Sequence, residues 1–262
     1  DGEPTEAEAS LGVDWAALLG SFDANFDISI GSATLNRTQA KDLYLDGTLR
    51  AGDATIREAR VADLLGADAA YRGELRGLGA DMLLDGRFDL AVAAPARFLK
   101  RLTGTSLRLG ETGSVTATGS LRGPLGEPHI EGNLTIYGGE VAMAGDVTLS
   151  SLSYDLSIDA EHPSLSDLFA AMEITTALNP ALGGGLLTGQ LTGDAAGFSL
   201  EDLAGRVGAM EFAGRLSFDG AGDDAGARPY VTAELDSGPV VWPALFASAE
   251  QEGGSDSNTL GA

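Results

Sequence analysis

The chain has 262 residues, of which 44% are hydrophobic and 6% aromatic, so it is long enough to bury a sizeable core. Its 39 acidic and 16 basic residues give a formal net charge of −23, which argues against nucleic acid as a partner, because nucleic-acid surfaces need clustered Lys and Arg. The lack of cysteine excludes disulfides, thiolate metal sites and a cysteine nucleophile, and leaves the redox compartment open.

Both ends of the chain are acidic and contain few large apolar residues. We interpret residues 1–12 and 249–262 as exposed tails or linkers, and we expect one folded domain over residues 13–248. The sequence contains no stretch of about 18 apolar residues and no leader with a basic and an apolar region. We therefore expect any membrane-spanning helix of the protein to lie outside this chain.

The domain begins with a helical pattern and continues with strands. Apolar residues at helical spacing run from Val13 to Phe22. Phe26, Ile28 and Ile30 then alternate with polar residues, which predicts a strand with one apolar and one wet face. About a dozen such strands joined by short turns, as at residues 50–53, 122–128 and 137–140, predict an antiparallel meander. Further alternating sets are Phe88, Leu90 and Val92; Ile130, Leu134 and Ile136; and Leu152, Tyr154, Leu156 and Ile158.

A repeat of about 70 residues is the strongest pattern in the sequence. One strand type recurs as Leu43–Leu49, Val115–Leu121 and Gly185–Leu191, with the glycines Gly47, Gly119 and Gly189. A second recurs as Ala69–Leu75, Val141–Val147 and Glu211–Leu216, with Gly73, Gly145 and Gly214. We expect three units, residues 23–103, 104–173 and 174–248, each with roughly four strands and one short helix. The predicted fold is all-β with short helices, a long antiparallel sheet that is twisted and curled into a groove.

The six recurring glycines fall in phase with the apolar residues, as in Leu45, Gly47 and Leu49. A glycine on the apolar face either lets the sheet bend toward that face or leaves room for a large neighbouring side chain. For a single glycine we favour the second interpretation. Six glycines at matched positions favour curvature.

Short helical runs close the units. They are predicted to begin at Pro95 and Pro163, because proline suits the first turn of a helix. A third run follows the strand that starts at Tyr230. We interpret these runs as caps on the sheet, since they are too short and too poor in basic residues for membrane anchors. Their apolar positions are Phe98, Leu99 and Leu102 in the first run, and Leu165, Leu168, Phe169 and Met172 in the second.

The sequence offers no candidate for catalysis. His129 and His162 stand beside prolines, away from any metalloprotease motif, and no nucleophile elbow, P-loop or dinucleotide fingerprint occurs. The acidic stretch from Asp219 to Gly226 lacks the closing glutamate of an EF-hand, so we favour a hydrated loop and leave calcium binding at Asp219–Asp224 open. We expect a protein that is not an enzyme and holds no cofactor and no metal.

Three stretches resemble the periplasmic region of the AsmA-like proteins, the group that includes TamB: Phe22–Leu35 continuing into Asp42–Ile56, His129–Leu149, and Gly197–Phe218. With the patterns between them they cover most of residues 14–247. The resemblance implies a β-groove that carries phospholipids from the inner toward the outer membrane. It also implies a periplasmic location, a tether to the inner membrane outside this chain, and envelope proteins as further partners.

The residues support the same function independently. Strands with one aliphatic face must close, stack or accept a ligand, because exposed apolar patches above about 400 Å² are rare. A groove without polar anchors suits acyl chains of phospholipid or a similar lipid. The alternatives are a scaffold module with a dry, self-packed core and, less favoured, a secreted β-solenoid adhesin. The candidate lining residues are Leu45, Leu49, Tyr71, Leu75, Phe88, Leu90, Val92, Leu121, Ile130, Leu134, Ile136, Val141, Met143, Leu156, Ile158, Leu187, Leu191, Phe212 and Leu216.

Overall fold

The computed structural model describes residues 20–35, 38–78, 82–103, 113–173, 179–220 and 230–239. Its strands are β1 (Ala24–Leu35), β2 (Thr38–Arg50), β3 (Asp53–Leu64), β4 (Ala67–Arg76), β5 (Leu83–Val92), β6 (Val115–Pro124), β7 (His129–Ile136), β8 (Gly139–Thr148), β9 (Ser153–His162), β10 (Gly185–Gly193), β11 (Gly197–Val207), β12 (Met210–Asp219) and β13 (Tyr230–Ser237).

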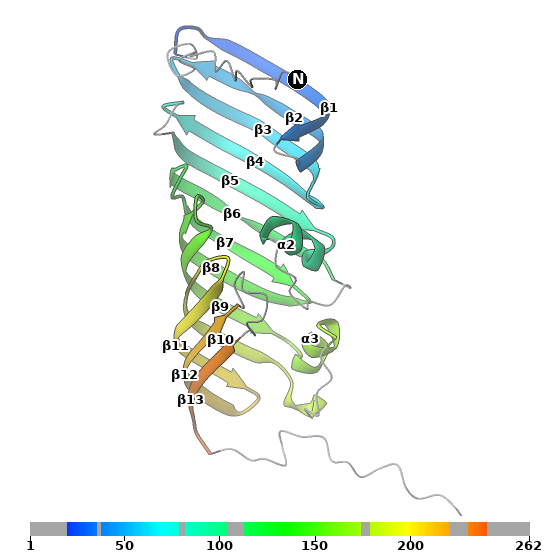
Figure 1. Cartoon of the computed structure of the whole chain (residues 1–262), viewed down its shortest axis with the longest axis vertical. Coiled ribbons are helices and arrows are strands. Elements are labelled where there is room, and N and C mark those ends of the chain that lie inside the picture. The colour runs from blue at the N-terminus through cyan, green and yellow to red at the C-terminus, as the bar shows by residue number, and fades with distance from the viewer. Residues whose placement is uncertain are drawn as a thin grey trace, which may run out of the picture.

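In this part of the chain the thirteen strands form one sheet, ordered as in the sequence, with β1 and β13 at its edges. Each strand pairs antiparallel with its neighbours, as β1 does with β2 and β12 with β13. The sheet twists and curls along its length (Figure 1). The predicted fold class, a long curled antiparallel sheet with short helices, is confirmed.

Tight turns join several neighbouring strands. The loop residues Ala51 and Gly52, between β2 and β3, both have positive φ, as do Tyr137 and Gly138 between β7 and β8. This is the conformation of a type I′ turn, whose twist matches that of hairpin strands. Both turns lie where the sequence predicts them.

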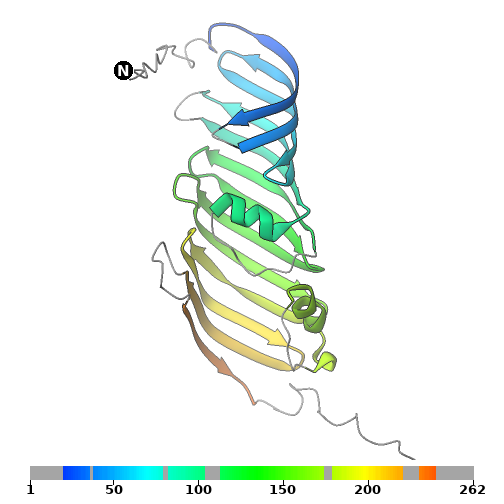
Figure 2. The same cartoon turned by 45° about the vertical axis from the view of Figure 1, so that its right-hand side comes forward.

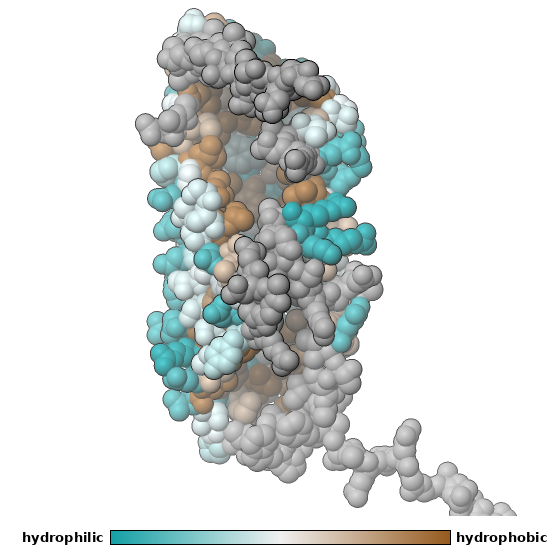
Figure 3. Space-filling view, viewed as in Figure 1, coloured by the Kyte–Doolittle hydropathy of each residue, from teal (hydrophilic) through white to brown (hydrophobic). Residues whose placement is uncertain are grey.

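The register places one set of side chains on one face of the sheet. Leu134 stands opposite Ala117 on one side and Val141 on the other, and Val141 stands opposite Ala160, which pairs with Leu187. Directly opposed residues share a face. We call the face that carries this row the trough face. Figure 3 shows hydrophobic residues gathered in a hollow between more hydrophilic margins.

Glycines on the trough face stand where the backbone of neighbouring strands comes close. A Cβ atom added at Gly145 would overlap the carbonyl oxygen of Asp155, and one added at Gly214 would overlap that of Glu234. At Gly47 the ring of Phe26 fills the space of the missing side chain. The glycine at Gly47 thus leaves room for an aromatic ring, as one interpretation predicts, and the close backbone contacts at Gly145 and Gly214 are compatible with the other, in which glycines let the sheet bend.

Two α-helices interrupt the meander within the described residues. α2 (Pro95–Thr103) follows β5 and α3 (Leu165–Ala171) follows β9, and the 3₁₀ turn η1 (Pro180–Leu182) precedes β10. Both helices leave the sheet at the ends of odd-numbered strands, so they stand on the same long margin, which we call the helical rim. They lie on the open side of the sheet (Figure 2).

The two helices begin differently. α2 starts at Pro95, as predicted. The prediction that the second helix starts at Pro163 is wrong, because Ser164 is the N-cap and α3 begins at Leu165. The Ser164 hydroxyl accepts a hydrogen bond from the backbone N–H of Asp167 at 3.3 Å, which satisfies one free amide of the first turn. Pro163 therefore precedes the cap.

Several sequence predictions fall wholly or mostly outside the described residues. They are the acidic tails, the helical patterns at 13–22 and after Pro239, and all but the first two residues of the acidic stretch 219–226. Among the described residues, the predicted unit 23–103 contains five strands, whereas the units 104–173 and 174–248 contain four each. No described element crosses a predicted unit boundary, and the division into units stays a prediction.

Candidate functional site

All nineteen candidate lining residues lie on the trough face. The register connects them from Leu45 and Leu49 on β2 to Phe212 and Leu216 on β12. Each is buried or half-buried. Among the described side chains none is less than 2% exposed, because only two short helices stand over the sheet and no second sheet covers it. Their role as a lipid lining stays a prediction.

Burial along the trough face is uneven. At the amino-terminal end Leu49, Ala54 and Ile56 are each 5% exposed and form a packed core, against which Phe26 and Tyr71 lie. Across β6–β9, by contrast, no hydrophobic side chain is buried. The curl is tight enough to close a core at one end and leaves the middle of the trough accessible.

Some residues of the trough face are absent from the predicted set. Ile56 and Leu203 stand next to β-bulges, at which the register shifts and apolar residues fall three apart instead of two. This spacing departs from strict alternation, so the pattern does not indicate them. Phe198 and Phe218 stack with ring centroids 5.6 Å apart. Both follow the period of two, so the alternating pattern of their strands could have identified them.

A cavity of about 250 Å³ lies between α3 and the trough face. Leu165 and Leu168 of α3 cover it, and Val141, Ala160 and Leu187 belong to its floor. The lining is almost entirely apolar. The cavity is therefore suited to a hydrocarbon group.

His162 holds α3 in place over this cavity. Its Nδ1 accepts a hydrogen bond from the Ser164 N–H at 3.1 Å, so the ring proton is on Nε2, which donates to the Tyr137 carbonyl oxygen at 2.9 Å. The ring packs over Gly139, where a Cβ atom would stand 2.7 Å from its Cδ2. Both nitrogens are satisfied, which gives His162 a structural role at the base of α3.

The outer face of the sheet carries the charged groups. Arg57 hydrogen-bonds to Asp46 and lowers the pKa of that carboxyl, and Lys41, 2.5 Å from Asp63, lowers the pKa of Asp63. These groups are exposed, so the pairs contribute little individually. On the trough face, burial raises the pKa of Tyr71.

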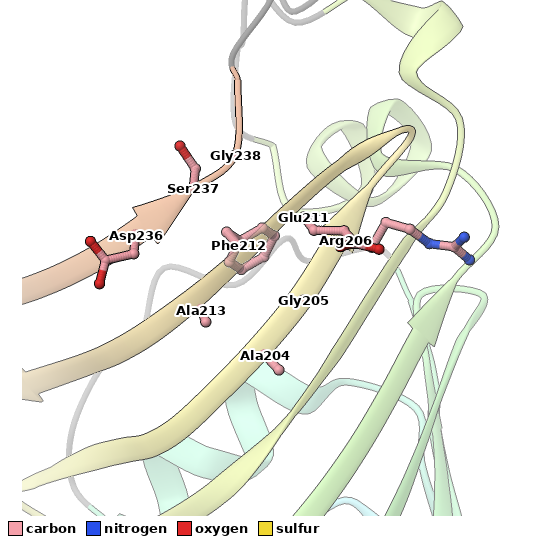
Figure 4. A pocket seen from close by; sticks show the side chains of 9 residues that line it. All are labelled: Ala204, Gly205, Arg206, Glu211, Phe212, Ala213, Asp236, Ser237 and Gly238. Atoms are coloured by element: carbon pink, nitrogen blue, oxygen red, sulfur yellow. The ribbon is translucent and has the colours of Figure 1, made fainter.

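A second, larger hollow of about 600 Å³ lies at the ends of β11, β12 and β13. Arg206 and Glu211 lie side by side on neighbouring strands there, and Asp236 stands apart on β13 (Figure 4). The hollow straddles both faces at the edge of the sheet and mixes charged with apolar groups. It offers no enclosed place for a ligand.

Within the described ranges, no group of three or more His, Asp or Glu side chains is arranged to hold a metal ion. Among the helices that the structure describes, none is long and apolar enough to span a bilayer.

Comparisons with family models, with curated proteins and with solved structures found no match to this chain. The geometry of the trough face is therefore the basis for assigning a function.

Proposed function

We propose that the trough holds acyl chains of phospholipid and contributes to lipid transport between the inner and outer membranes of a bacterial envelope, without catalysing a reaction. One observation carries this proposal. The apolar face of a thirteen-stranded sheet runs the length of the molecule, and in its middle no hydrophobic side chain is buried. A face of this size is stable in water only when something apolar covers it.

The chemistry of the lining supports an acyl chain as the cover. Leu, Ile, Val, Met and Ala dominate the trough face from β6 to β9. The described part of the chain contains no buried side-chain nitrogen or oxygen without a hydrogen-bond partner. In the described part of the trough, no fully buried polar side-chain atom is therefore left unpaired for a ligand. The hydrocarbon chain of a lipid fits such a surface, and the headgroup of the lipid stays at the solvent-exposed margin of the trough.

The resemblance to the AsmA-like proteins supports the periplasmic location and a tether outside this chain. Repeated units fit the same proposal. Gly73, Gly145 and Gly214, which stand at matched positions of the predicted units, have φ of +159°, +155° and +153°. A backbone conformation recurring at this spacing is expected of a trough lengthened by copying one unit.

A scaffold module is the competing function. The packed core around Leu49 and Ile56 favours it, because a dry core needs no ligand. Under this alternative the whole trough face is covered by protein, and lipid is absent.

Native mass spectrometry of gently purified protein, together with lipid extraction, separates the two functions. We expect phospholipid on the wild-type protein. Ala160→Leu fills the cavity under α3 and excludes about two methylene groups of the acyl chain from it. Each buried methylene group contributes about 0.8 kcal/mol to binding, so lipid retention should weaken about tenfold. The matched control is Ala142→Leu, on the exposed outer face of β8. Protein without lipid, and with a trough face inaccessible to apolar probes, would favour the scaffold.

A further inference from the structure

The expectation that the helical runs are poor in basic residues is wrong for α2, whose basic residues are an exception in this acidic chain. Arg97, Lys100 and Arg101 stand within nine residues of a protein with 16 basic and 39 acidic side chains. All three are exposed, and none forms an ion pair with any residue in the described ranges. Arg101 lies near enough to Asp63 to lower its pKa slightly, but Asp63 is paired with Lys41. The three charges are therefore available to a ligand.

Helix stability does not account for these residues. A positive charge is favourable at the carboxyl end of a helix and unfavourable at the amino end. Lys100 and Arg101 fit this rule, but Arg97 stands in the first turn, which contains no acid. α3 differs, since it has Asp167 in its first turn and no basic residue in its last turn. The basic character of α2 thus has another cause.

The position of α2 suggests that cause. The helix crosses the open side of the sheet (Figure 2), and hydrophilic residues gather at its place beside the apolar hollow (Figure 3). Pro95 is buried and Phe98 is half-buried, which anchors one side of the helix. Cations held at the margin of an apolar trough match an amphiphile with a hydrocarbon tail and an anionic head.

The charge of the rest of the chain strengthens the match. Thirteen of the sixteen basic residues precede Gly123, and the remaining 140 positions hold three. Along the trough, the surroundings of α2 are therefore the most favourable place for a negative headgroup, and the acidic carboxyl-terminal part repels it.

We propose that Arg97, Lys100 and Arg101 of α2 bind the negatively charged headgroup of a net-anionic phospholipid whose acyl chains lie on the trough face. This inference rests on the proposed function, since it assumes that the trough holds the chains. It adds a selectivity that the apolar lining cannot supply, because hydrocarbon tails are common to all phospholipids.

The test loads full-length protein from vesicles of equal parts phosphatidylglycerol and phosphatidylcholine and measures both lipids on the recovered protein. We expect the wild-type protein to enrich phosphatidylglycerol on the order of fivefold, the factor that one basic side chain contributes near an anionic lipid surface. In the triple variant Arg97→Gln, Lys100→Gln and Arg101→Gln the enrichment is lost while total lipid is retained. The double variant Arg97→Lys and Arg101→Lys keeps the charge and should keep the enrichment.

The control variant is Arg50→Gln, Arg72→Gln and Arg87→Gln, which removes the same charge from exposed positions on the outer face. It should leave the enrichment unchanged. Circular dichroism establishes that each variant is folded. If the triple variant fails to fold, the three single variants replace it, and each should show part of the loss of enrichment.

The outcomes distinguish the two proposals. Protein that retains no lipid of either kind overturns the proposed function. Lipid retained without preference by the wild type, or with undiminished preference by the triple variant, overturns the role of α2 alone. A triple variant that loses vesicle binding but keeps the enrichment assigns α2 to docking on the membrane surface, and saturation of α2 by inorganic phosphate without lipid assigns it to a free anion. Either result also overturns the inference.

Discussion

The strands β1–β5 and β6–β9 follow the same alternating pattern, but their trough faces differ. In β1–β5 the side chains of Leu49, Ile56 and Val92 are 5% exposed or less, whereas β6–β9 contain no buried hydrophobic side chain. The first region carries three aromatic residues on its trough face, Phe26, Tyr71 and Phe88, and β6–β9 carry Tyr154 alone. Both regions have glycines at which neighbouring strands come close.

This difference separates two properties of a curled sheet. Alternation determines which side chains share a face, while the size of those side chains determines whether the hollow closes. Aromatic rings reach across the curl at the amino-terminal end and pack a core. Aliphatic side chains in the middle do not, and the hollow stays open to a ligand.

The largest expected effect comes from removing a side chain of the packed region. Ile56→Ala should lower the free energy of unfolding by about 2–5 kcal/mol, because it leaves a cavity in a closed core. Leu134→Ala, in the open region, should lower it by about 1 kcal/mol, because the side chain is already partly exposed. Urea unfolding with and without phospholipid measures both.

Added phospholipid sharpens this comparison. It should stabilise the wild-type protein, because it binds the folded state, and should increase the effect of Leu134→Ala more than that of Ile56→Ala. Equal effects of the two substitutions in the lipid-free protein would show that the middle of the trough is packed as tightly as its end.

An intermediate loss of stability is expected on substitution of the glycines that occupy matched positions in the two regions. Gly145→Ala should destabilise the protein by more than about 2 kcal/mol, since the new Cβ atom would meet the Asp155 carbonyl and the backbone has φ of +155°. Gly73→Ala should do the same in β4. Thermal unfolding is the measurement, with Gly31→Ala as the control, because nothing lies within 4 Å of the new atom there. A harmless Gly145→Ala would indicate that packing, and not the glycines, sets the curl.

The smallest effect concerns the outer face of the packed region. Arg57 hydrogen-bonds to Asp46 and lowers its pKa, so the stabilisation is complete above the pKa of the carboxyl in the unfolded chain and is lost as the pH falls through the lowered folded value. Asp46→Asn should therefore destabilise the protein slightly at about pH 7, and its difference from the wild type should vanish below about pH 3. Denaturation midpoints across this range test it, with Asp89→Asn as the control, because Asp89 is exposed and forms no ion pair within the described ranges. A difference that grows in acid would contradict the assignment.

The side chains that lie on the trough face can be predicted from the sequence, because most strands keep the period of two. The nineteen candidate residues share the trough face for this reason, from Leu45 to Leu216. Bulges limit the method. Around Asp202, which has φ of +50°, the chain inserts a residue, and Leu200 and Leu203 both reach the trough face although they stand three apart.

The depth of burial could not be predicted in the same way. Ile28 and Leu49 both follow the alternating pattern, yet Ile28 is 44% exposed and Leu49 is 5% exposed. The first stands on an edge strand and the second between two paired strands, which is a property of the whole sheet. The cavity under α3 also depends on contacts between distant segments, because Leu165, Val141 and Leu187 meet only in the folded chain.

The position of both described helices on one long margin has a mechanical consequence. Opposite the helical rim, the margin of the sheet is made of strand ends and the loops between them, as far as the structure describes it (Figure 1). Because the described helices stand on one margin only, a ligand can reach the open part of the trough, across β6–β9, from the opposite margin. A long flexible molecule can thus enter sideways and leave sideways, without being threaded from end to end and without the sheet having to unfold.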